Sequence, residues 1–135
     1  MKKDIDFGKV EDLAVAIVPE KEGELPEEEW GVYLVNMKNE PLEGVIVAST
    51  GYGALDGKEV KTSTLRQFFD KVSANEFVKV ELIEKRLFAL NNEFWISFWM
   101  HGKMFDKRYV FVTESINPEN FTLIPLIGKR GVMIK

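Results

Sequence analysis

The sequence predicts a mainly β fold, an antiparallel sandwich of about seven strands built as a single domain over residues 1–135. Runs rich in Val, Ile, Phe, Tyr and Trp recur about every eight to twelve residues, with turn residues between them. The clearest run, "FVKVELI" at 77–83, alternates apolar with charged side chains, as a strand with one solvated face does. The chain also has little room for the crossover helices that a parallel sheet needs.

Two strands and an acidic loop are predicted near the amino terminus. "LAVAIV" at 13–18 and "WGVYLVNM" at 30–37 are apolar runs of strand length. Between them, "PEKEGELPEEE" at 19–29 contains two prolines and lacks apolar periodicity, so we expect an exposed loop. Binding of a partner by this acidic loop is an alternative to simple solvation.

A third strand and a glycine-rich loop follow. "GVIVAST" at 44–50 predicts the strand, and "GYGALDG" at 51–57 predicts a flexible hairpin loop. The glycine spacing is similar to a dinucleotide-binding fingerprint, but that motif must open a helix. Here Asp56 and Gly57 form a turn pair that leads into β-prone residues, so we do not expect phosphate binding.

The segment "STLRQFFDKV" carries two conflicting signals. Its apolar residues stand at i, i+3, i+4 and i+7 from Leu65, and Thr64 with Gln67 makes a capping-box pattern. These features predict one short helix near 64–72. The preceding "VKTSTL" is β-prone, however, and the spacing of a sandwich favours a strand. Both alternatives stay open, as a strand that runs into Thr64 or a short helix after it.

The stretch 94–111 predicts a hairpin with large apolar side chains on both faces. Gly102 followed by Lys103 suits a type II′ turn, which pairs His101 with Met104 and Met100 with Phe105. The core face then holds Phe94, Ile96, Phe98, Met100, Phe105, Lys107, Tyr109 and Phe111. The outer face holds Trp95, Ser97, Trp99, His101, Met104, Asp106, Arg108 and Val110.

Three arrangements could cover the tryptophans of that outer face. Loops or the apolar C-terminal segment 121–135 could fold over it, Arg108 could stack on a tryptophan, or a second subunit could bury it. The C-terminal segment is the favoured cover, because it is apolar and has no other evident partner. Its Pro125 suits a sheet edge, and "GKRG" could turn the chain into a last strand at "VMI".

The composition limits the kinds of site that the chain can hold. It has no cysteine, which excludes disulfides, thiolate zinc sites and cysteine nucleophiles, and fits a reducing, cytoplasmic location. With a single histidine and no calcium-loop spacing, we expect no metal and no cofactor. The amino terminus brings Asp4 and Asp6 where a signal peptide needs apolar residues, and no run approaches a membrane span.

The charge distribution gives weak support to nucleic-acid binding. The net charge is −4, with ten acidic and four basic side chains in residues 1–30, and six basic and three acidic ones in residues 101–135. Binding to phosphates needs many clustered cations, so a small basic end on an acidic chain does not favour nucleic acid as a partner. The cations that would serve this alternative are Lys103, Lys107, Arg108, Lys129 and Arg130.

Catalysis by Ser97, His101 and Asp106 is not expected. At the rise of a β-strand, Ser97 and His101 lie roughly 13 Å apart, beyond the reach of a nucleophile and its base. No other catalytic constellation is evident, and we therefore expect a protein that is not an enzyme.

Most of the chain resembles a known family. The motifs "EEWGVYLVNMKNEPLEGVIVASTGYG", "FVKVELIE", "LNNEFWISFW" and "IPLIGKRGV" are similar to those of short uncharacterised bacterial proteins, some labelled phenylalanyl-tRNA synthetase subunit. The resembling residues are structural in kind, and the class II synthetase motifs are absent, so the resemblance implies no active-site residue. The strand order also resembles immunoglobulin and fibronectin type III sandwiches.

We therefore expect a non-enzymatic interaction module that binds a protein partner or itself through the outer face of the 94–111 hairpin. Tryptophan and arginine are common anchors of interfaces, which supports this hypothesis. The alternative is a nucleic-acid (tRNA) binding or synthetase-accessory domain. The candidate partner-binding residues are Trp95, Trp99, His101, Met104 and Arg108.

Overall fold

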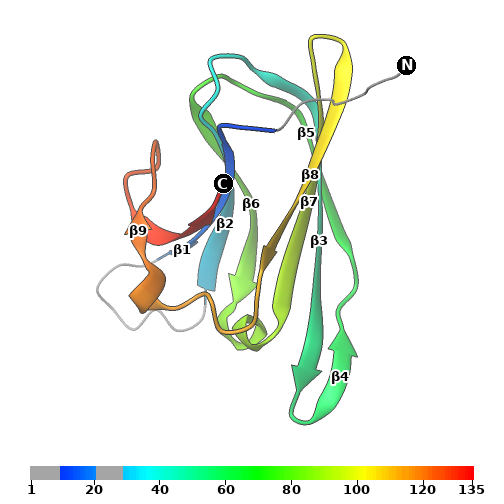
Figure 1. Cartoon of the computed structure of the whole chain (residues 1–135), viewed down its shortest axis with the longest axis vertical. Helices are drawn as coiled ribbons and strands as arrows, with labels where there is room; N and C mark the ends of the chain where they lie inside the picture. The colour runs from blue at the N-terminus through cyan, green and yellow to red at the C-terminus, as the bar shows by residue number, and fades with distance from the viewer. Residues whose placement is uncertain (1–9, 21–28) are drawn as a thin grey trace.

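The computed structural model describes residues 10–20 and 29–135, which form two antiparallel β-sheets that face each other (Figure 1). The first sheet has the order β6-β2-β1-β10-β9, and the second has the order β4-β3-β7-β8, with β5 also paired to β3. The strands are β1 (Leu13–Pro19), β2 (Glu29–Asn36), β3 (Leu42–Leu55), β4 (Lys58–Lys61), β5 (Leu65–Val72), β6 (Glu76–Glu84), β7 (Asn91–Met100), β8 (Lys103–Phe111), β9 (Thr122–Leu123) and β10 (Arg130–Ile134).

This arrangement confirms the prediction of a mainly β protein with two antiparallel sheets. The described residues form ten strands rather than about seven, because residues 58–72 make two strands and the C-terminal segment adds two short ones. Two short 3-10 helices, η1 (Lys85–Ala89) and η2 (Pro118–Asn120), connect strands. The predicted acidic loop at 19–29 lies largely outside the described residues.

Residues 65–72 form strand β5, so the predicted short helix is wrong. The strand pairs with β3 in a register that joins Leu42 to Val72 and Ser49 to Leu65. The apolar set that matched a helical spacing is divided by the sheet. Val72 is buried in the core, whereas Phe68 is 61% exposed on the other side. Pairing with β3 therefore outweighs the local helical pattern.

The glycine-rich segment 51–57 is mostly strand rather than loop. β3 continues to Leu55, and only Asp56 and Gly57 turn the chain, both with positive φ (54° and 79°). Two central residues of positive φ make the type I′ turn that suits the twist of a hairpin. The predicted flexible loop is thus a tight turn at the end of a long hairpin, visible at the lower end of Figure 1.

The hairpin of β7 and β8 forms, but its predicted register is wrong by two residues. His101 and Gly102 occupy the turn with φ of 55° and 73°, so Met100 pairs with Lys103 and Phe98 with Phe105. The turn is therefore of type I′ with histidine at its first central position. A shift by two residues keeps every side chain on its predicted face, since side chains alternate with a period of two.

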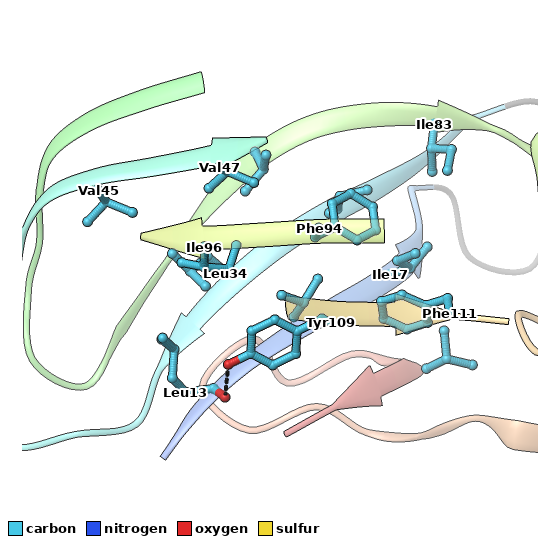
Figure 2. Packing of buried hydrophobic residues seen from close by; sticks show 14 of the residues in the cluster. Leu13, Ile17, Leu34, Val45, Val47, Ile83, Phe94, Ile96, Tyr109 and Phe111 are labelled. Carbon is cyan, nitrogen blue, oxygen red and sulfur yellow. Dashed lines mark hydrogen bonds between the residues drawn. The ribbon is translucent and has the colours of Figure 1, made fainter. Parts of the chain in front are cut away.

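The inner faces of both sheets share one hydrophobic core. Phe94, Ile96 and Phe98 of β7 are each 1% exposed, as predicted from the hairpin pattern. They pack with apolar residues of the first sheet such as Ile17 and Leu34 (Figure 2). The Tyr109 hydroxyl also donates a hydrogen bond of 2.7 Å to the carbonyl oxygen of Leu13, which links β8 to the start of β1. Burial raises the pKa of Tyr109, so this donor stays protonated.

The C-terminal segment covers the first sheet, not the tryptophans of the second. Ile124 is fully buried on the outer face of β1 and β2, against Ala14, Ala16 and Tyr33, with Ile127 beside it. Figure 1 shows this segment on the side of β1 and β2 that faces away from β7 and β8. The prediction that the C-terminal segment covers the tryptophans is therefore wrong. β10 pairs with β1, and this pairing fixes the segment at the first sheet.

We predict that Tyr109→Phe lowers the free energy of unfolding by about 1–3 kcal/mol, because the Leu13 carbonyl loses its partner in a buried position. Urea denaturation measures this loss. Tyr33→Phe is the matched control and should cost less, since the Tyr33 hydroxyl bonds Glu20 at the partly solvated edge. A Tyr109→Phe protein as stable as the wild type would contradict the prediction.

Candidate binding face

Five large apolar side chains are exposed together on the outer face of the second sheet, and we call this set the aromatic face. They come from β3, β5, β7 and β8 and are neighbours across the strands. Ile46 of β3 pairs with Phe68 of β5, and Trp99 of β7 pairs with Met104 of β8. Trp95 of β7 pairs with Ala48, which stands two residues after Ile46 in β3. The members and their exposed fractions are Ile46 41%, Phe68 61%, Trp95 42%, Trp99 47% and Met104 51%.

Trp99 packs closely over a glycine of β3. β3 is irregular between Glu43 and Ile46, and Gly44 there adopts a φ of 54°. A Cβ atom on Gly44 would stand 3.2 Å from Cδ1 of Trp99, a tighter approach than most side chains allow. The indole therefore lies against the backbone of β3, while its outer surface is exposed.

Trp95 is flanked by a cation, as one of the three predicted arrangements proposed. The Arg108 guanidinium lies 6.0 Å from the Trp95 ring centroid, and its Nε is 3.7 Å from the Glu93 carboxylate. Arg108 is still exposed, so it supports the ring from one side without covering it. Of the predicted binding residues, the structure thus brings together Trp95, Trp99, Met104 and Arg108.

His101 does not join them. It stands at the tip of the β7–β8 turn, and its Nε2 pairs with the carboxylate of Glu40. His101 has a positive φ of 55°, which the turn requires. Its side chain thus contacts the connection between β2 and β3 rather than the aromatic face.

The basic residues of the nucleic-acid alternative are dispersed. Arg108 lies on the outer face, whereas Lys107 lies on the inner side of β8, where its Nζ donates to the carbonyl of Val10. Lys129 and Arg130 lie in the C-terminal segment, at the first sheet, and Arg130 donates to the Phe121 carbonyl. Lys103 is at the hairpin turn. These five residues do not form a single basic patch.

Sequence reasoning missed Ile46 and Phe68 as members of the aromatic face. Phe68 stands in a segment whose spacing also fits a helix, so its neighbours across the sheet are not evident from the sequence. Ile46 stands in an unbroken apolar run, "VIV", in which alternation gives no sign of which residue is exposed. The pairing of β5 with β3 is what shows that both side chains lie on the same face as the tryptophans.

An open groove of about 560 Å³ adjoins the aromatic face at Trp95. Its lining includes Tyr52, Lys61 and Glu93, together with Thr50 and Thr64, whose hydroxyls lie 2.9 Å apart. The groove forms because β3 changes its partner there, from β5 up to Ser49 to β4 from Tyr52. The outer face of this sheet is therefore both apolar and uneven.

A second cavity, of about 320 Å³, opens between the two sheets at the edge of β6. The Glu81 carboxylate accepts a hydrogen bond of 3.0 Å from the Ser49 hydroxyl there. Glu81 points inward because a bulge at Val32 and Tyr33 shifts the register of β6. Burial raises the pKa of Glu81, and the bond from Ser49 only partly offsets that effect.

Within residues 10–20 and 29–135, no three side chains of His, Asp or Glu are grouped to hold a metal ion. No helix among these residues is long and apolar enough to cross a membrane.

No family model, curated protein or solved structure matches the chain. The resemblance drawn from the sequence stays a prediction.

We predict that Glu81→Gln stabilises the protein at pH 7 and has little effect near pH 3. A raised pKa means that the folded state holds the Glu81 proton more tightly than the unfolded state. The contribution of protonated Glu81 to the free energy of unfolding is therefore complete at acidic pH. It is lost as the pH rises through the pKa that Glu81 has in the folded state. Glutamine carries no charge and can still accept from Ser49.

Thermal unfolding at the two pH values measures this difference. Glu84→Gln is the control, because Glu84 is exposed and pairs with Arg86 at the surface. The same gain at both pH values would show that ionisation of Glu81 is not the cause.

Proposed function

We propose that the chain is a non-enzymatic interaction module and that the aromatic face associates with the same face of a second copy. One contrast carries this proposal. The outer face of β1 and β2 is covered by Ile124 and its neighbours, whereas the aromatic face exposes five large apolar side chains. Clusters of this kind on a soluble domain mark interaction sites, and tryptophan is a frequent anchor of interfaces.

The charges around the aromatic face favour a protein surface over a polyanion. Arg66 and Arg108 stand at the two ends of a cross-strand row that contains Ala48 and Trp95. Asp106 ends the next row, and Glu93 pairs with Arg108. Because both signs are present, this face suits a partner that also carries both signs.

A two-fold axis that crosses the strands between these two rows would make the face complementary to itself. We call them the Trp95 row (Arg66, Ala48, Trp95, Arg108) and the Ser97 row (Phe68, Ile46, Ser97, Asp106). With that axis, each strand lies over its own counterpart and the Trp95 row faces the Ser97 row of the second copy. Arg108 then faces Asp106, and the Trp95 indole faces the small Ser97 side chain.

Three other two-fold axes in the plane of this face oppose like charges. An axis parallel to the strands and midway between β3 and β7 would set Arg66 over Arg108, and an axis at the level of the Trp95 row would set Arg108 over itself. An axis at the level of the Ser97 row would oppose Asp106 to itself. Like charges facing each other at an interface are strongly unfavourable, so the charges select the axis between the rows.

We predict a dimer whose dissociation constant rises about thirtyfold in Trp99→Ala, the effect of losing an interface anchor worth about 2 kcal/mol. Sedimentation equilibrium measures this constant. Leu123→Ala is the matched control, since Leu123 is 64% exposed on the first sheet. The stability of the dilute monomer should change little, and a loss of several kcal/mol would show instead that Trp99 belongs to the core.

A charge exchange tests the orientation of the two copies. Asp106→Arg and Arg108→Asp should each weaken the dimer, and the double variant should restore much of the affinity. A double variant as weak as the single ones would contradict the proposed axis. A monomer at all concentrations that binds single-stranded nucleic acid in a salt-dependent way would favour the nucleic-acid alternative instead.

A further inference from the structure

We propose that a pocket at the end of the core, near η1, binds a small molecule with an apolar tail and a carboxylate head. The pocket has a volume of about 430 Å³, within the range of small-molecule sites. It lies between the start of β2, η1 and the connection from β8 to η2. It shares no residue with the aromatic face, so this inference is independent of the proposed dimer.

The interior of the pocket is apolar and aromatic. Trp30, Phe88 and Ile116 line it and are only 4%, 6% and 4% exposed. The Trp30 ring meets Phe88 edge-on, with centroids 4.9 Å apart, and Phe121 lies 5.9 Å from Trp30. These ring contacts order the wall, which offers an apolar surface to an alkyl or aryl group.

The rim of the pocket is basic. Lys85 and Arg86 are consecutive exposed residues of η1, and both line the opening. Arg86 lies 3.0 Å from Glu84, but both side chains of that pair are exposed, so water screens the contact and a ligand can compete for the guanidinium.

Glu114 also lines the pocket, and its backbone N–H donates a hydrogen bond to the Phe88 carbonyl. Among the described lining residues, two cations stand against one anion, which favours a single carboxylate over an ammonium group, and these cations are too few for a polyphosphate. An arginine can hold a carboxylate by two parallel hydrogen bonds. The burial of the walls and the exposure of the cations therefore match a molecule with one apolar and one anionic end.

The experiment follows Trp30 fluorescence in a Trp95→Phe, Trp99→Phe background, in which Trp30 is the remaining tryptophan of three. Octanoate is the probe, and octan-1-ol is its uncharged control. We expect saturable binding of octanoate that is clearly tighter than that of octan-1-ol. Lys85→Glu with Arg86→Glu should weaken octanoate binding at least about tenfold and leave octan-1-ol binding unchanged.

A second variant tests the location. Ala89 lines the pocket, so Ala89→Trp should fill it and abolish binding of both compounds, as read by ligand-observed NMR. Ala54→Trp, at an exposed position of β3, is the control and should bind normally. Equal affinity for the acid and the alcohol, unchanged binding in the Glu variant, or no binding of octanoate at millimolar concentration would each overturn the proposal.

Discussion

The alternation of side chains along each strand is the constraint on which the rest of this structure depends. Two stacked sheets have two inner faces, which form the core, and two outer faces. Apolar side chains on an outer face must be covered by another segment or by a partner, or stay exposed to solvent. β1 shows the constraint most clearly. Leu13, Val15 and Ile17 face the second sheet, while Ala14 and Ala16 are fully buried under the C-terminal segment. The second sheet has an apolar outer surface at Trp95 and Trp99, where Trp99 lies against Gly44 and Arg108 flanks Trp95.

The sequence was sufficient for those parts of the fold in which local chemistry and alternation agree. The strand at 77–83 and the inward phenylalanines of β7 follow from the period of two, and this assignment survived an error in the turn because a shift by two residues preserves faces. Residues 65–72 could not be assigned in the same way. Their spacing satisfies a helix, and the partner that makes them a strand, β3, is a long-range neighbour rather than a local one.

The candidate site was predictable in part for the same reason. Trp95, Trp99, Met104 and Arg108 belong to one hairpin, so their common face is a local property. Ile46 and Phe68 reach that face only through the pairing of β5, β3 and β7, which no local pattern encodes. The pocket near η1 combines β2, η1 and the chain after β8, and its aromatic walls resemble any other core residues in the sequence.

The pairing of β10 with β1 also has a consequence for biosynthesis. β1 and β2 leave the ribosome early. Ile124, which covers their outer face, and β10, which pairs with β1, are made about a hundred residues later. During this interval the nascent chain displays an apolar sheet surface without its cover, and such surfaces promote aggregation. The protein can complete its first sheet only after the C-terminal segment has emerged, so chaperone binding to the nascent chain should be concentrated on β1 and β2.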